Sequence, residues 1–110
     1  MIFDKQGNTT IITQESVSFS VFLDRINDAY KKFEKDNIII NLFSFDEITV
    51  NDVLEFSQLS GVHRSKNKSF VIVTDNISYD SIPEELVLVP TLQEAFDLIE
   101  MDEIERDLGI

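Results

Sequence analysis

The apolar run from Asn37 to Phe43 (NIIINLF) constrains the fold of this chain more than any other stretch. Three of its apolar side chains, Ile38 to Ile40, are consecutive, so they cannot all point to one face. Such strands are typical of parallel sheets covered on both faces. An acidic, polar loop at 44–47 follows directly. Open α/β sheets bind ligands at the carboxyl ends of their strands, so we look for function in this loop first. It contains no Gly-rich phosphate-binding pattern, Cys or His, and therefore predicts no particular reaction.

Length and composition fit one globular domain, residues 1–110. The 110 residues are 43% hydrophobic, which suffices to bury a single core. The chain has no Cys, which excludes disulfides and thiolate metal sites. No apolar run reaches the roughly 18 residues of a membrane span, and the N-terminus lacks a basic-then-apolar signal pattern. We therefore expect a soluble cytoplasmic protein.

The net charge of −12 is concentrated in the last third of the chain. Residues 1–74 carry ten acids and eight bases, whereas 75–110 carry eleven acids and a single base, Arg106. Nucleic acids and anionic membranes bind Lys and Arg, so this charge argues against both. A protein partner with a basic surface is compatible with it. The alternative is that the acidic helices only keep the protein soluble, as a monomer or weak homo-oligomer.

Periodicity predicts an α/β domain with the order β-β-α-β-α-β-(short α)-β-α. The expected elements are strands at 1–4, 9–13, 37–43, 69–74 and 86–89, helices beginning near Ser20, Thr49 and Thr91, and a helical turn at 83–85. Right-handed crossovers then give a mixed, largely parallel sheet with the N-terminal β-hairpin as its antiparallel edge. The sequence leaves open whether the helices cover one face or both.

Local patterns also predict the helix ends and the core. Thr49 with Asp52, and Thr91 with Glu94, are spaced as helix caps, and Gly61 is expected just beyond the end of the second helix. The predicted core residues share helical or strand spacing: Phe22, Ile26, Phe33, Ile38, Ile40, Val71, Val73, Phe96 and Ile99.

The single His, His63, falls in a basic stretch with Arg64, Lys66 and Lys68. A lone His in such a stretch is usually a solvated surface residue, so we expect a surface loop there. A metal site would need further ligands at set spacing, which the sequence lacks. We expect no metal and no cofactor.

The last ten residues, 101–110, form an acidic helix end that departs from the preceding pattern. Asp102 and Glu103 stand where the apolar stripe should continue. Unpaired charges are costly to bury, so we expect the helix to bend or its end to leave the core. Ile104, Leu108 and Ile110 would then contact another chain, or would fold back and complete the core.

The strands at 37–43 and 69–74, the helix-starting loop between them, and the final strand–helix unit at 87–99 (VLVPTLQEAFDLI) together resemble the STAS domain. This module is shared by bacterial anti-sigma factor antagonists and the cytoplasmic tails of sulfate transporters. Members that act as phosphorylation switches carry Asp-Ser, a small residue and Gly in the loop after the buried strand. Here that stretch is 48–52, with Val50 near the acceptor position. Thr49 is the remaining candidate phospho-acceptor, and a helix cap is its alternative role.

The tail at 103–109 is also similar to that of small bacterial proteins labelled ribonuclease Z. The residues do not support that chemistry, because such nucleases need several His and Asp ligands for two metal ions and this chain has one His.

The sequence therefore predicts a non-enzymatic, STAS-like interaction and regulatory module. The partner-binding residues would be those of the loop and helix start: Asp46, Glu47, Thr49, Asn51 and Asp52. The alternative is a small ligand-binding protein or enzyme that uses carboxylates. Its candidates are Asp46, Asp75 and Asp80, which follow strands.

Overall fold

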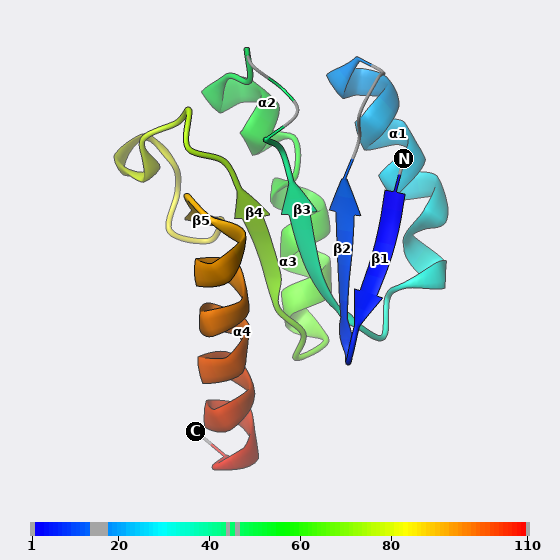
Figure 1. The fold of residues 1–110 in the computed structure, drawn as a ribbon, viewed down its shortest axis with the longest axis vertical. Helices are drawn as coiled ribbons and strands as arrows, with labels where there is room; N and C mark the ends of the chain where they lie inside the picture. The colour runs from blue at the N-terminus through cyan, green and yellow to red at the C-terminus, as the bar shows by residue number, and fades with distance from the viewer. Residues whose placement is uncertain (1, 14–17, 44, 46, 110) are drawn as a thin grey trace.

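A computed structural model, which describes residues 2–13, 18–43, 45 and 47–109, has an α/β fold built on one five-stranded sheet (Figure 1). Its strands are β1 (Ile2–Gln6), β2 (Thr9–Thr13), β3 (Asn37–Asn41), β4 (Phe70–Val73) and β5 (Val87–Val89). Its helices are α1 (Phe19–Ala29), α2 (Val50–Leu54), α3 (Ser57–Ser65) and α4 (Leu92–Asp107), with 3-10 turns η1 (Tyr30–Lys32) and η2 (Tyr79–Ser81). The predicted fold class is confirmed.

The strands lie in the sheet in the order in which they occur in the chain, β1-β2-β3-β4-β5. β1 and β2 form the predicted antiparallel hairpin, and the remaining neighbours pair in parallel. The hairpin turns at Gly7, whose φ of +62° costs little for a residue without Cβ. The hairpin thus forms an antiparallel edge on a parallel sheet, as expected.

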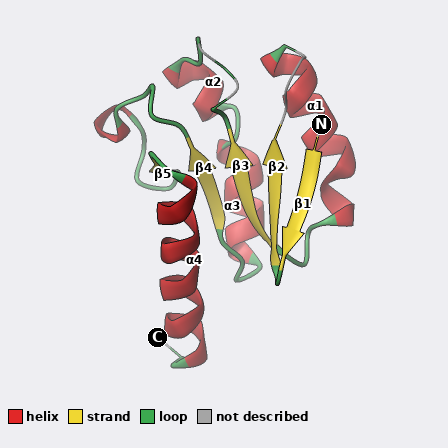
Figure 2. Ribbon diagram, in the orientation of Figure 1, coloured by secondary structure: helices red, strands yellow, loops and turns green. Residues whose placement is uncertain are grey.

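Helices cover both faces of the sheet (Figure 2). From β2 to β5 each new parallel strand is added on the same side of the previous one, so right-handed crossovers place their connecting helices on the same face of the sheet. The helices α1, α2 and α3 pack on that face. α4 follows the last strand and packs on the opposite face, across β3, β4 and β5. None of the helices in the described ranges is long and apolar enough to cross a membrane.

Two apolar clusters fill the two faces of the sheet. The larger includes Phe22, Ile38 and Ile40, and the smaller includes Val71 and Ile99. All of the predicted core residues are buried except Phe96, which is partly buried against the smaller cluster. Ile40 and Val71 are buried, as predicted. Their neighbours Ile39 and Ile72 are buried as well, because both faces of the sheet are covered, so burial alone does not fix the register.

The segment after Thr49 differs from the prediction. It forms two short helices, α2 and α3, and Gly61 lies inside α3 instead of ending a helix. A C′ glycine usually takes positive φ, and Gly61 does not. α3 continues because its inward positions include the buried polar residues Ser60 and His63, which an apolar pattern does not count.

Two other predicted boundaries also change. The helical turn expected at 83–85 lies earlier, at η2, and Leu86 N instead donates to Pro83 O at 3.0 Å in a simple turn. α4 continues without interruption past Asp102 and Glu103 to Asp107. The reason lies in the contacts of its acidic side chains, described below.

Candidate functional site

The loop between β3 and α2 lies at the carboxyl end of the parallel strands, where the sequence placed the partner-binding residues (Figure 1). Glu47, Thr49 and Asn51 are exposed there, and Asp52 is partly buried. Asp46 lies outside the described residues. The described part of the predicted site therefore presents polar side chains on one loop and the helix start that follows it.

Thr49 and Asp52 hold the start of α2 through a reciprocal pair of hydrogen bonds. Asp52 N donates to Thr49 Oγ1 at 3.2 Å, and Thr49 N donates to Asp52 Oδ2 at 3.1 Å. The predicted cap is thus confirmed as a capping box. One Asp52 carboxylate oxygen is used in this way, so Asp52 has less capacity for a partner than the sequence suggested.

Two phenylalanines of the loop have opposite roles. Phe45 packs inward, with its ring centroid 5.5 Å from that of Phe22 and 5.9 Å from that of Phe19. Phe43 is 43% exposed, and its backbone N donates to Asn41 Oδ1 at 3.1 Å. Sequence reasoning missed Phe43 as a surface residue. Its position could have indicated this exposure, because Phe43 follows the buried Leu42 beyond the end of the strand, where helices no longer cover both faces of the sheet.

Of the three carboxylates of the alternative enzyme hypothesis, Asp75 and Asp80 are described, and Asp46 is not. Asp75 follows β4, Asp80 lies in η2, and both are exposed. Within the described segments, no three His, Asp or Glu side chains are grouped so as to hold a metal ion. The structure therefore presents Asp75 and Asp80 as exposed charges.

His63 is not in a surface loop, as predicted, but is fully buried in α3. Its Nε2 lies 2.7 Å from the carbonyl oxygen of Asp36, and its Nδ1 lies 2.7 Å from Tyr30 Oη. A carbonyl can only accept, so Nε2 carries the proton and Tyr30 donates to Nδ1. Burial holds the pKa of the imidazole below its ordinary value, and nearby cationic side chains lower it further. His63 is thus a neutral internal link.

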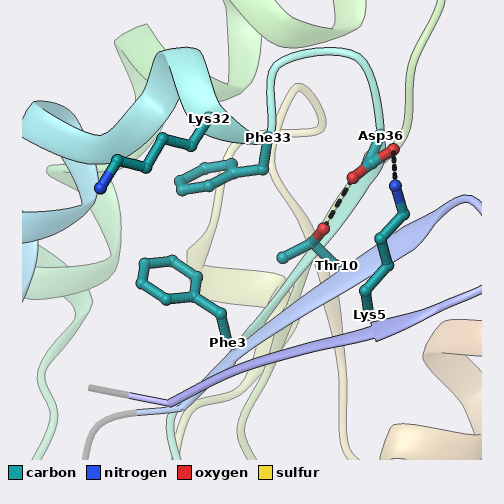
Figure 3. A pocket seen from close by; sticks show the side chains of 6 residues that line it. All are labelled: Phe3, Lys5, Thr10, Lys32, Phe33 and Asp36. Atoms are coloured by element: carbon teal, nitrogen blue, oxygen red, sulfur yellow. Dashed lines mark hydrogen bonds and ion pairs between the residues drawn. The ribbon is translucent and has the colours of Figure 1, made fainter.

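A pocket of about 300 Å³ lies beside this link, between the hairpin and the residues at the end of η1 (Figure 3). On one side Thr10 Oγ1 donates to Asp36 Oδ2 at 2.9 Å, and Lys5 Nζ lies 3.4 Å from Asp36 Oδ1. On the other side the rings of Phe3 and Phe33 are 5.5 Å apart. Both carboxylate oxygens of Asp36 already have partners within the protein, so the polar side of the pocket is internally satisfied.

Asp102 and Glu103 bind the amino end of the sheet, contrary to the expectation that they leave it. Ser69 Oγ donates to Asp102 Oδ2 at 2.8 Å, and Asn37 Nδ2 donates to Glu103 Oε1 at 3.0 Å. Three more hydrogen bonds join the same groups: Asn8 Nδ2 donates to Glu103 Oε2 at 3.0 Å, Ser69 N donates to Asn37 Oδ1 at 2.9 Å, and Arg106 donates to Ser69 Oγ at 2.7 Å. We call these residues, Asn8, Asn37, Ser69, Asp102, Glu103 and Arg106, the amino-end cluster. The acids are paired with polar groups, so the helix has no reason to bend away.

Beyond these contacts, Ile104 and Leu108 are 53% and 67% exposed, and the fold-back alternative is wrong for both. Ile110 lies outside the described residues. Contact of Ile104 and Leu108 with another chain stays a prediction.

The sequence matches no protein-family model, and no curated protein is detectably similar to it. The resemblance to STAS domains therefore stays a prediction, and the functional argument depends on the geometry above.

Proposed function

We propose that this chain is a non-enzymatic interaction and regulatory module of the STAS type, working in the bacterial cytoplasm as anti-sigma factor antagonists do, and docking through its β3–α2 loop. The observation that carries the proposal is the capping box of Thr49 and Asp52, which fixes a helix start whose neighbours are exposed. The capping box and the inward-packed Phe45 each hold a described part of this surface in place, which lowers the conformational entropy lost when a partner binds. The open carboxyl end of the sheet therefore suits recognition.

The chemistry of the loop favours a protein partner with basic and apolar groups. Phe43 supplies an exposed aromatic ring, the kind of side chain that dominates binding energy when it enters a pocket. Glu47 and Asn51 supply acceptors around it, and the net charge of −12 would accelerate encounter with a basic surface. Affinity would thus come from the ring, and orientation and rate from the polar rim.

Thr49 gives this surface a means of regulation. Its side chain is exposed, so a kinase could reach the hydroxyl. Phosphate would add about −1.5 to −2 charge units close to Glu47 and Asp52, and like charges repel. Phosphorylation would therefore disrupt the capping box and weaken docking, although the chain lacks the Asp-Ser, small residue and Gly of the STAS switches.

The test compares capture of partners from the native cell by matched variants. Phe43→Ser/Glu47→Lys should lose the partners that the unaltered protein captures, whereas Asp24→Lys, which makes the same change in net charge at an exposed position of α1, should keep them. Equal losses in both variants would show that only net charge matters. Equal retention in both would overturn the proposed docking surface.

The carboxylate-based alternative makes a separate prediction. A ligand that binds only the folded protein must raise its melting temperature. Mg²⁺, Mn²⁺ and nucleotides should leave the melting temperature unchanged under the interaction proposal. A rise that Asp75→Asn or Asp80→Asn abolishes would favour the ligand-binding alternative instead.

A further inference from the structure

The last turns of α4 expose three large apolar side chains. Met101 is 59% exposed, Ile104 is 53% exposed and Leu108 is 67% exposed. Their spacing is i, i+3 and i+7, which places them on one side of a helix. We call these three residues the α4 stripe. Such a stripe is the pattern by which amphipathic helices recognise one another.

The α4 stripe faces away from the sheet. At about 100° per residue, its members lie on the side of the helix opposite the buried Ala95 and Ile99. The inward side near the helix end is held by the amino-end cluster, in which Asp102 and Glu103 bond to Ser69 and Asn37. The backbone that carries the stripe is thus tied to the sheet on its other side, and no loose helix end needs ordering when a partner binds.

Acidic side chains border the α4 stripe on both sides. Glu100 and Asp107 lie along one border, Glu105 along the other, and Asp97 at the upper end, and all four are exposed. The one base of α4, Arg106, is partly buried and donates to Ser69. An apolar centre with a wholly acidic border complements an apolar centre with a basic border.

We infer that the α4 stripe docks an amphipathic α-helix of a partner protein whose own apolar stripe is flanked by Lys and Arg. A second copy of this chain is a poor occupant, because two α4 stripes in contact would bring their acidic borders together, and like charges at these positions repel. The surface is also separate from the proposed β3–α2 docking loop. It lies beside the amino ends of the strands, whereas the loop lies at their carboxyl ends.

The experiment uses the full chain and three labelled synthetic peptides of about 18 residues, long enough to form a helix when bound. The first has Leu on one helical face and Lys elsewhere, the second has the same composition in scrambled order, and the third keeps the Leu face but replaces Lys with Glu. Fluorescence anisotropy at physiological ionic strength measures binding. We expect the first peptide to bind at least about tenfold more tightly than either of the others.

Variants locate the binding. Ile104→Ser/Leu108→Ser should weaken binding of the first peptide by about tenfold or more and leave the circular dichroism melting curve unchanged, since both side chains are exposed. Glu100→Lys/Glu105→Lys should weaken it more than the matched charge change Asp24→Lys/Asp28→Lys on α1. Chemical-shift changes in the first complex should centre on 97–108.

Three results would overturn the inference. Equal affinity for the patterned and scrambled basic peptides would mean that charge alone attracts them. Unchanged affinity in the Ile104→Ser/Leu108→Ser variant would place binding elsewhere. Concentration-dependent dimerisation that the same variant abolishes would identify a second copy as the occupant. Because the peptides do not involve the β3–α2 loop, Phe43→Ser/Glu47→Lys should bind them normally, which separates failure here from failure of the proposed function.

Discussion

The two ends of the parallel strands are built differently. At the amino end, polar side chains bond within the protein: Asn37 links the Ser69 backbone N to the Glu103 carboxylate, and His63 links the Asp36 backbone carbonyl to the Tyr30 hydroxyl. At the carboxyl end, the described polar side chains around the β3–α2 loop mostly face solvent. Polar groups that are satisfied internally stabilise the fold, whereas those left to water remain available to a ligand.

This contrast assigns stability to one end of the sheet and recognition to the other. Substitutions at the amino end should lower the free energy of unfolding and leave docking of the folded protein intact. Substitutions of exposed carboxyl-end residues outside the helix cap, such as Phe43 and Asn51, should do the reverse. The following predictions test that division, beginning with the largest expected effect.

His63→Leu should lower the free energy of unfolding by roughly 2–4 kcal/mol, because it leaves the Tyr30 hydroxyl and the Asp36 carbonyl without their partner. Urea denaturation monitored by circular dichroism measures the change. Asn51→Ala, an exposed substitution at the carboxyl end, is the control and should change stability by less than about 0.5 kcal/mol. Similar losses in the two variants would abolish the proposed division.

The same side chain should give stability a pH dependence. An unfolded His has a pKa near 6.5, whereas burial, with help from Lys66, Lys68 and Arg106, lowers the pKa of His63 in the folded protein. Below about pH 6.5 the unfolded state therefore binds a proton that the folded state does not bind. The contribution of His63 to the free energy of unfolding is lost as the pH falls toward the pKa of His63 in the folded protein. The stability difference between the natural protein and His63→Leu should shrink from about pH 7.5 to about pH 5. A constant difference would contradict the buried, neutral imidazole.

Asn37 and Asn41 stand at opposite ends of β3 and allow a comparison within one strand. Asn37→Ala should lower the free energy of unfolding by roughly 1–3 kcal/mol, because the buried amide bonds both Ser69 N and Glu103. Asn41→Ala removes one bond, to Phe43 N, and should cost less than about 1 kcal/mol. The urea concentration at the midpoint of unfolding measures the stability of each variant, provided that the dependence of the unfolding free energy on urea is the same in both. A larger loss at Asn41 would reverse our assignment of the two ends.

Thr49→Ala should lower the free energy of unfolding by about 1 kcal/mol, the usual effect of removing a helix cap. Thr49→Ser keeps the accepting oxygen and should change stability little. Thermal melting distinguishes the two variants. If Thr49→Ser were as destabilising as Thr49→Ala, the hydroxyl would not be the stabilising group.

The smallest effect is expected at Ser60. Ser60 is 1% exposed, and its buried hydroxyl has no hydrogen-bond partner among the described residues. Ser60→Ala should therefore leave stability unchanged or raise it by up to about 1 kcal/mol, since it removes an unsatisfied group and favours the helix. A loss of more than about 1 kcal/mol in urea denaturation would reveal a partner for this hydroxyl.

The features predictable from sequence were those set by neighbours along the chain. The strand at Ile38–Ile40 followed from consecutive apolar residues, and the cap at Thr49 followed from a partner three residues away. The burial of His63 was not predictable, because its partners Asp36 and Tyr30 are 27 and 33 residues distant. The sequence indicated where the polar residues after β3 lie, but only the structure distinguished the exposed Glu47 from the partly buried Asp52, which takes part in the cap.

The contacts of α4 were missed for the same reason. Ser69 lies 33 residues before Asp102, and Asn37 lies 66 residues before Glu103. A charged residue within an apolar helical stripe predicts that the helix leaves the core, unless the surface it packs against offers a polar partner. Helical periodicity carries no information about that surface. Polar residues at the starts of β3 and β4 were visible in the sequence, but their meeting with α4 depends on the sheet order.

The strand order also has a consequence for synthesis. Each strand pairs with the one made just before it, so a chain leaving the ribosome can extend its sheet step by step. The smaller apolar cluster is an exception, because the side chains that complete it, such as Ala95 and Ile99, belong to α4, the last described element. A nascent chain would therefore carry one bare apolar face until α4 emerged. Premature termination before Leu92 would release an aggregation-prone sheet that needs a chaperone, and not a shorter working protein.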